Sequence, residues 1–552
     1  MRATSRPASD AAPAKPSLID PANGIVWRIV LVLLLVGTAV LMFSLTRGLT
    51  FNLDEWTVVT QRRGAGAPSL LAPHNEHLSL LLLIVYLGLL KIGGLNSYWL
   101  QMVPLVALQL TLGWLLFVVA RRRVGAGVAV SVAAFALLCG YAYENFLIPG
   151  QEGQMGSIVA GVAAFAVLDL ARTRRTDLAL AGLMLTGLLC SGMGIPVLVG
   201  ITLELALTAD GRQRLWVVAA PFALYLLWYV GYGTNRAELS ELTLSVVWAW
   251  TAACQAAGAI IGERQIEPGQ ELLLLMLALL AYRVFKVPPA ARVRLAALTT
   301  ILVIFYGLTA ISRHDIAPPS SSRYLTVGVV FMLLMLVEGA RGWRIRVWVP
   351  FVVLALAWVS FAKADGNAKA IRDGRTLFLQ RSDRVRASLG AVDLLGRDRV
   401  PPTLEIAPLA APFLEAGPWF GALDGLRGNP ADSPAEIEHA PPDVRAYADD
   451  TLLRAGGLAL RPAPAWAAAR AAGCVRLAGT TTIVPPGGLR VQAGAKQPLT
   501  LRARRFGTDW QMVGVLPIPP RLTVELHPLR DAAPVPYRIQ APGATRICRL
   551  GE

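Results

Sequence analysis

A series of long apolar runs separated by short basic turns is the feature that most constrains how this chain folds. The first run, from Ile25 to about Thr46, has enough residues to cross the roughly 30 Å hydrocarbon core of a bilayer as a helix. Of the 552 residues, 55% are hydrophobic and only 16% are charged. A soluble protein of this length carries more charge, so the sequence predicts a protein that crosses a membrane many times.

The basic residues predict how the helices are oriented. The net charge is +16, and many basic residues of the first 350 lie in short clusters between apolar runs, such as Arg121 to Arg123. Clusters of this kind mark the cytoplasmic loops of membrane proteins. The sequence holds no aromatic-interleaved basic stripe and no nucleic-acid-binding motif, so nucleic acid is not expected as a partner.

Two apolar segments are expected not to cross the membrane. If 78–94 or 242–262 spanned it, the basic clusters that follow would move to the outer side. We therefore expect both segments to lie in the outer interface. About eleven transmembrane helices remain, near 25–46, 100–120, 125–143, 154–171, 177–192, 194–208, 214–232, 271–285, 295–312, 324–340 and 346–363.

The chain is expected to have four parts. Residues 1–24, rich in Pro, Ala and Ser, predict a disordered cytoplasmic tail, and 25–363 form the all-α transmembrane domain. Residues 364–469 predict an extracytoplasmic amphipathic helix and a Pro-rich linker region. After about residue 470, short alternating runs separated by Gly and Pro predict an extracytoplasmic β-sandwich-like domain, 470–552.

The five cysteines fall into two groups. Cys139, Cys190 and Cys254 lie in apolar segments, where a small buried side chain is the expected role. Cys474 and Cys548 flank the predicted β region on the oxidising side of the membrane. A disulfide between these two is therefore expected.

Polar side chains suited to chemistry gather in the predicted outer loops. Asp54 and Glu55 stand in "FNLDEW", directly after the first apolar run. The predicted cytoplasmic turns hold Arg and Lys with few acids, so chemistry is expected on the outer face. The other candidate substrate-binding residues are His74, Glu76, His77, Glu144, Arg236, Arg313, His314, Arg323 and Tyr324.

Simpler roles are also open for the two acids and for Arg323 and Tyr324. Asp54 and Glu55 also suit solvated loop acids. Arg323 and Tyr324 stand at the start of a predicted span, where they also suit an interfacial anchor.

The motif "PHNEH" also has alternatives. Asn75 suits a helix N-cap, with Glu76 in a favourable place in the first turn. His74 and His77 are three residues apart and also suit a metal site shared with Glu76.

The predicted location restricts the chemistry. Outside the membrane there is no nucleotide pool, and the chain has neither a P-loop nor a Rossmann fingerprint. A group transfer there needs an activated donor carried in the bilayer, such as a polyprenyl-phosphate sugar. Arg313 or Arg323 would hold the phosphate through charge-assisted bonds. A carboxylate would remove the proton of the acceptor hydroxyl as the new bond forms.

The order of these motifs resembles the GT-C superfamily, the integral-membrane glycosyltransferases that use polyprenyl-phosphate sugars. The segments "LDEW", "HNEHLSLLLLIVYLGLL" and "LLFVVARRRVG" follow one another as in that superfamily, and residues 26–210 carry the likeness best. The resemblance implies that Asp54 is the catalytic base and that Glu55 supports it or binds the acceptor or a metal. It thus allows a divalent cation, Mg²⁺ or Mn²⁺, near the pair. "HNEH" replaces the usual "HPP" of the protein mannosyltransferase-like branch.

The sequence therefore predicts a multi-pass enzyme of the bacterial plasma membrane. It would move a hexosyl or pentosyl group from a polyprenyl-phosphate donor to a cell-envelope glycan, lipid or protein. The β-sandwich resembles the carbohydrate-binding modules of some actinobacterial cell-wall arabinosyltransferases. Two other functions remain open: a transporter or flippase for a polyprenyl-linked sugar or another anion, and a non-enzymatic assembly subunit that holds a polysaccharide.

Overall fold

The chain folds into two compact units. The first, called here the helical unit, comprises Met1–Thr46, Leu70–Leu82 and Met102–Arg375, and the second, called the mixed unit, comprises Arg47–Ser69, Leu83–Gln101 and Thr376–Glu552. The structure is a computed structural model that describes residues 24–62, 70–208, 210–234, 242–463, 474–475, 481–495, 498–514, 517–529, 531, 533–542 and 544–550.

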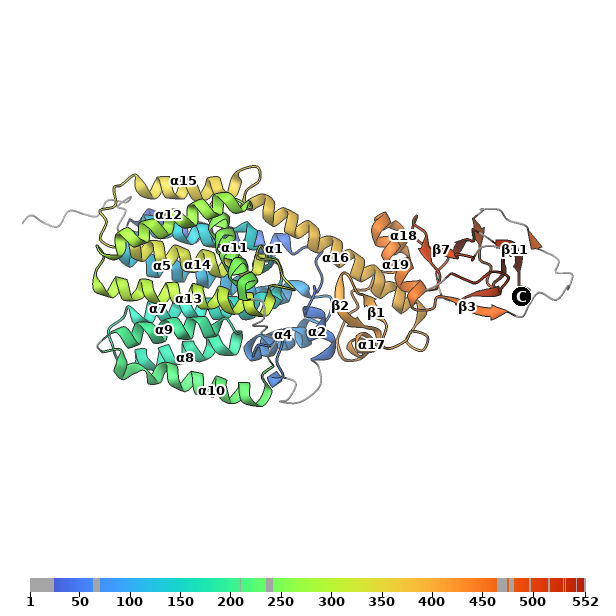
Figure 1. Cartoon of the computed structure of the whole chain (residues 1–552), viewed down its shortest axis with the longest axis horizontal. Helices are drawn as coiled ribbons and strands as arrows, with labels where there is room; N and C mark the ends of the chain where they lie inside the picture. Colours follow the sequence, from blue (N-terminus) through green and yellow to red (C-terminus); the bar gives the residue numbers. More distant parts are fainter. Residues whose placement is uncertain are drawn as a thin grey trace, which may run out of the picture. The chain divides into compact units, whose positions relative to one another are not determined.

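The helical unit is a bundle of apolar helices, most of which run alongside one another (Figure 1). A helix satisfies its backbone polar groups internally, as a membrane span requires. The longest one, α5, consists of two segments that meet at Gly125, whose φ of 77° no ordinary helix contains. The main helices are α1 (Ile25–Leu45), α5 (Tyr98–Leu137), α7 (Glu152–Leu168), α8 (Arg174–Cys190), α9 (Gly194–Leu207), α10 (Trp216–Tyr232), α11 (Leu242–Ile260), α12 (Ile266–Val284), α13 (Pro289–Arg313), α14 (Ser322–Gly339) and α15 (Val349–Ala362).

Several of these helices are suited to a membrane. By length and composition, seven helical stretches among the described residues are long and apolar enough to cross one. The chain is therefore a multi-pass membrane protein. The count of about eleven spans and the orientation of the helices stay predictions. The seven stretches are Ile25–Leu45, Tyr98–Leu137, Arg212–Tyr232, Thr243–Ile260, Pro289–Arg313, Ser322–Gly339 and Val349–Leu395.

The two segments expected to lie in the interface both form helices. The first, α4 (Leu80–Gly93), has 14 residues, or about 21 Å of helix, which is short for a span. The second, α11, runs across the direction of its neighbours (Figure 1). Trp248 of α11 donates to the carbonyl of Ala317 between α13 and α14. The carbonyl of Ile260, at its other end, accepts from Ser360 near the end of α15.

Charged side chains join five helices at one end of the helical unit, called here the arginine end. Arg123 of α5 donates to both oxygens of Asp169 after α7, at 2.6 and 2.8 Å, and also to Glu338 of α14. Arg294 of α13 donates to Glu204 of α9 at 2.6 Å and to Asp169 at 3.4 Å. These side chains are at most 14% exposed, so the ion pairs are largely shielded from solvent.

The part of the mixed unit that precedes the sandwich is folded where the sequence predicted a linker. Residues 364–469 were expected to hold one helix and a Pro-rich linker, but after α16 (Asn367–Leu395) the chain continues into further elements. Pro434 and Pro442 each start a helix, the position in which proline loses no helical hydrogen bond. The further elements are the β1 (Glu405–Ala407) and β2 (Ala411–Glu415) hairpin, α17 (Ala416–Gly425), α18 (Pro434–His439) and α19 (Pro442–Arg454).

The C-terminal part is a sandwich of two antiparallel sheets. Side chains of both sheets, including Val491, Leu526, Ala503 and Ile539, form one buried core. The first strand begins at Leu458, before the predicted boundary at 470. The four-stranded sheet has the order β5 (Thr482–Ile483), β10 (Arg538–Gln540), β7 (Arg502–Arg504), β8 (Gln511–Met512), and the five-stranded sheet the order β3 (Leu458–Ala463), β9 (Thr523–Pro528), β6 (Leu489–Ala493), β11 (Ala544–Arg549), β4 (Cys474–Val475).

Two covalent or polar links stabilise this region. Cys474 of β4 and Cys548 of β11 lie opposite each other and form a disulfide, so that prediction is confirmed. Asp449 of α19 accepts the backbone N–H groups of three successive residues after β7, at 2.8 to 2.9 Å. The buried carboxylate of Asp449 therefore joins α19 to the sandwich, within the mixed unit.

Replacing one acid of the arginine end should destabilise the helical unit. In the Glu338→Gln variant, Arg123 and Arg294 lose part of their buried counter-charge, and we expect a loss of about 3–5 kcal/mol in unfolding free energy. Unfolding of the purified protein in detergent measures this loss of unfolding free energy. Glu438→Gln, at an exposed glutamate of α18, is the matched control. Equal stability of both variants would show that the ion pairs do not hold the bundle.

Removing the disulfide should weaken the sandwich. It joins residues 74 apart, so the Cys474→Ala/Cys548→Ala double variant should lose about 4 kcal/mol by the chain-entropy account. Thermal unfolding with and without reductant measures the difference. Reductant should lower the transition of the original protein to that of the variant and leave the variant unchanged. Peptide mapping that finds both thiols free would contradict this.

Candidate functional site

The acidic segment after α1 has a strained backbone. Leu53 has a φ of 46°, a positive value that is uncommon for a residue other than glycine. Asp54 follows, immediately before α2 (Glu55–Gln61), and its carbonyl accepts the N–H of Val58. Such strain persists only where the surroundings impose it, and it is frequent at functional sites.

The two acids of this segment have different surroundings. Glu55 is only 2% exposed, and its Oε2 accepts the N–H of Asn52 at 2.8 Å and the hydroxyl of Tyr98 at 3.1 Å. These donors hold the carboxylate in one orientation. Asp54 is partly exposed. Glu55 is therefore suited to shaping the segment, and Asp54 to meeting a substrate.

Buried aromatic rings surround the acidic segment. The Phe51 ring centroid lies 5.3 Å from that of Trp56 and 5.4 Å from that of Tyr98, both edge-on. Tyr86 and Trp419 extend the cluster, with Trp419 5.9 Å from Trp56. Edge-on contacts of this kind add to the stabilisation from burial. Sequence reasoning missed Tyr98 and Trp419, which no motif marks.

Residues far along the chain fix the backbone before the acids. The hydroxyl of Ser382 in α16 accepts the N–H of Thr50 at 3.1 Å. Arg386, one turn later, donates to the carbonyl of Gly48 at 3.2 Å. The region expected to be a helix and linker thus positions the acidic segment, within the mixed unit.

The motif "PHNEH" forms a tight turn in the helical unit. His74 and His77 exchange two backbone hydrogen bonds of 3.0 Å, and the residues between them, Asn75 and Glu76, have φ of 49° and 71°. Positive φ at both central positions is the type I′ turn, which favours asparagine. The interpretation of Asn75 as a helix N-cap is therefore wrong, because α4 begins only at Leu80.

An arginine binds this turn from α13. Arg313 Nη2 lies 3.1 Å from the carbonyl oxygen of Asn75 and 3.5 Å from Glu76 Oε2. Burial, then the positive charge of Arg313 and then His74, lower the pKa of His77 to about 4. His77 is therefore neutral at neutral pH.

A second arginine pairs with an acid at the start of α14. Arg323 Nε lies 3.0 Å from Glu144 Oε2, and its side chain is 32% exposed. Its carbonyl accepts from Gln154 at 2.5 Å, which fixes the backbone there. The Tyr324 ring packs edge-on against Trp248, with centroids 5.7 Å apart, and is mostly buried. Tyr324 is thus held in the protein core, whereas Arg323 keeps part of its surface open.

The predicted site residues fall into separate groups. His314 ends α13 with its ring Nδ1 3.1 Å from the carbonyl oxygen of Ala310. Arg236 lies outside the described residues. The groups are Asp54 with Glu55 in the mixed unit, and in the helical unit His74, Glu76 and His77 with Arg313, and Glu144 with Arg323 and Tyr324.

No three His, Cys, Asp or Glu side chains of the described residues group closely enough to hold a metal ion. The Mg²⁺ or Mn²⁺ that the family resemblance allows near Asp54 and Glu55 would thus have two carboxylates to bind. Glu55 Oε2 already accepts two hydrogen bonds. This donor set fits only an ion that keeps several water ligands, as Mg²⁺ does.

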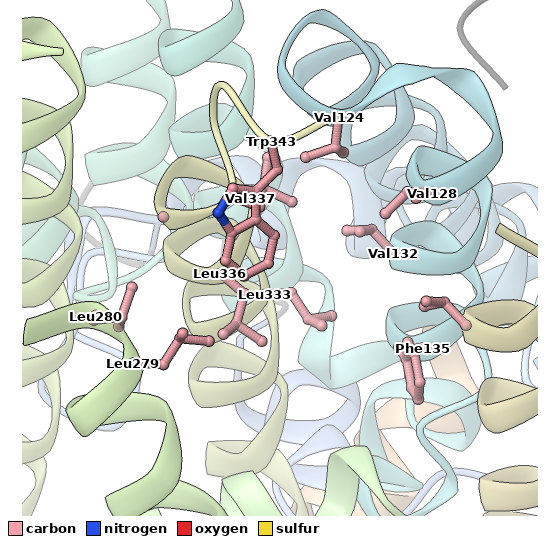
Figure 2. A pocket seen from close by; sticks show the side chains of 13 residues that line it. Val124, Val128, Val132, Phe135, Leu279, Leu280, Leu333, Leu336, Val337 and Trp343 are labelled. Carbon is pink, nitrogen blue, oxygen red and sulfur yellow. The ribbon is translucent and has the colours of Figure 1, made fainter. Parts of the chain in front are cut away.

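Two apolar cavities lie in the helical unit. The smaller, about 210 Å³, is lined by aliphatic residues of α5, α12 and α14 and by the rings of Phe135 and Trp343 (Figure 2). The larger, about 460 Å³, lies among α11, α12, α13 and α14. It follows α13 from Thr299 to Ile311, and Arg313 and His314 come within the next turn.

A solved structure of another protein is similar to this chain. No protein-family model and no curated protein matches the chain. ArnT from Cupriavidus metallidurans, in a crystal structure bound to undecaprenyl phosphate, is similar at 14% sequence identity, over 71% of this chain and 75% of that chain, with a TM-score of 0.36.

Acidification should destabilise the turn at His77. Because its pKa is lowered to about 4 in the folded chain, the unfolded chain, with a pKa of about 6.5, binds more protons between these values. The stability that neutral His77 contributes is therefore fully present above pH 6.5 and is lost as the pH falls toward 4. Unfolding followed from pH 7 to 4 should show less acid sensitivity in His77→Gln. His439→Gln, at an exposed histidine, should behave like the original protein.

Proposed function

We propose that this protein is a membrane glycosyltransferase that uses a polyprenyl-phosphate sugar as donor. The observation that carries the proposal is the strained acidic segment: Glu55 is buried and oriented by Asn52 and Tyr98, beside the partly exposed Asp54.

A lipid phosphate needs an apolar channel and a cation. The cavity along α13 has apolar walls and a volume of about 460 Å³. Arg313 follows in the next turn of α13. Arg323 is the other candidate, since its partly exposed side chain has Glu144 as counter-ion. In this proposal the isoprenoid tail occupies the cavity and an arginine binds the phosphate through charge-assisted bonds.

Asp54 acts as the general base. It takes the proton of an acceptor hydroxyl while the hydroxyl oxygen bonds to the anomeric carbon. The bond between that carbon and the phosphate oxygen breaks through an oxocarbenium-like state. Polyprenyl phosphate leaves with the electron pair of that bond. Glu55 keeps Asp54 in position through the start of α2.

A divalent cation is a further part of the proposal. Asp54 and Glu55 would hold Mg²⁺ or Mn²⁺ through their carboxylates, with water completing the coordination shell. Such an ion would neutralise negative charge on the donor phosphate.

Transport is the alternative, and the described charges do not favour it. Transporters place ionisable residues near mid-span. The buried charges here stand toward helix ends, as with Glu204, which is followed by only three residues of α9, and Glu338, next to the last residue of α14. The orientation with Asp54 outside, the bacterial membrane and the envelope acceptor are retained from the sequence as parts of the proposal.

Substitutions should separate chemistry from donor binding. Asp54→Asn keeps the shape but cannot take the proton, so sugar transfer should fall by about 10²–10⁴-fold while donor lipid still binds. Arg323→Gln or Arg313→Gln should instead weaken donor binding, because the phosphate loses a charge-assisted partner. Transfer and lipid binding by the purified protein, with a panel of polyprenyl-phosphate sugars, measure both effects.

The matched control is Asp398→Asn, which removes the charge of an exposed aspartate elsewhere in the mixed unit. It should transfer sugar as the original protein does. Near-normal transfer by Asp54→Asn would refute the catalytic role. Absence of transfer by the original protein with every donor, together with donor movement across vesicles, would identify a transporter.

A further inference from the structure

The β-sandwich is the most basic part of the chain. From Leu458 to Glu552 it has thirteen Lys and Arg against four Asp and Glu, a net charge of +9 out of +16. Two of the four acids are already neutralised, because Glu525 pairs with Arg490 and Asp531 with Arg505. The basic residues of the sandwich therefore outnumber its own acids by nine.

Part of this charge is concentrated on the outer face of the four-stranded sheet. Ala503 and Ile539 lie opposite each other and point into the core. Their neighbours on each strand must point outward, since side chains alternate along a strand. The outward face therefore carries Arg502 and Arg504 of β7, and Arg538 and Gln540 of β10. We call these four residues the arginine face.

The pairing on the arginine face is electrostatically unfavourable. Arg538 lies directly opposite Arg504 across the two strands, and like charges in this position destabilise a sheet. Among the described residues, no carboxylate pairs with Arg502, Arg504 or Arg538. Arg504 instead lies over the ring of Trp510, 4.5 Å from its centroid, which orients the guanidinium. An external anion would relieve the repulsion.

We propose that the arginine face binds an acidic glycan, a polysaccharide that bears carboxylate or phosphodiester groups. Guanidinium groups bind such anions in a bidentate manner, and Gln540 and Trp510 can contact hydroxyls and sugar rings beside them. This binding function goes beyond the proposed transfer reaction and does not depend on it.

The face suits a glycan better than a membrane surface. Ile483 and Met512 are its exposed apolar side chains, at 53% and 50% exposure. They stand on β5 and β8, the two outer strands of the sheet, and are thus about 14 Å apart at ordinary strand spacing. The arginines lie between them, so the described residues of this face form no continuous apolar surface that could enter a bilayer.

Binding to a charged glycan tests the proposal. The full-length protein in phosphatidylcholine nanodiscs would be titrated with polygalacturonate and with its fully methyl-esterified form, which has the same backbone without the charge. We expect binding of the acidic form only, weaker at higher salt. Arg502→Gln and Arg538→Gln should each weaken it by about tenfold or more, and Arg549→Gln, at an exposed arginine of the other sheet, should not.

Stability provides the second readout. Arg538→Gln removes a like-charge pair, so the variant should unfold at the same or a higher temperature than the original protein while binding less glycan. A lowered unfolding temperature would make the binding loss a folding defect and overturn the assignment. Equal binding of both glycan forms, or an equal loss of binding in Arg549→Gln, would also overturn the assignment. Binding to phosphatidylglycerol vesicles without binding to polygalacturonate would overturn it as well. The last result would identify a membrane-binding surface instead.

Discussion

The buried ion pairs of the arginine end are the interaction on which the helical unit depends. Two arginines and three acids from five helices meet where solvent screening is weak, so each charge requires its partners. Apolar helices in lipid gain little from hydrophobic contact with one another. Directional charge pairs therefore supply the specificity, and two of the helices that they hold in register carry candidate arginines, Arg313 at the end of α13 and Arg323 at the start of α14.

The candidate site is built from strained turns on rigid supports. Leu53, Asn75 and Glu76 all have positive φ and stand next to or within the predicted motifs. Each segment is held by a distant part of its own unit, Thr50 by Ser382 and Asn75 by Arg313. Such anchoring lets polar side chains keep one orientation in loops that would otherwise exchange conformations.

Several particular predictions from the sequence agree with the structure. The apolar runs, the short α4, the sandwich and the disulfide between Cys474 and Cys548 all depend on local patterns or on pairing of the only two cysteines outside apolar segments. The linker between α16 and the sandwich was predicted wrongly because proline there starts helices. Strand β3 was missed because it contains Pro462, which an edge strand tolerates.

The sequence by itself determined that this chain enters a membrane, because hydrophobic composition and run length act locally. It also marked the acids and basic residues as candidates. Only the tertiary structure decided what each charge does: Arg123 and Arg294 form buried ion pairs, Arg323 stays partly open, and Glu55 is enclosed beside Asp54. The reason is physical, since the role of a charge depends on partners and burial brought from residues hundreds of positions away.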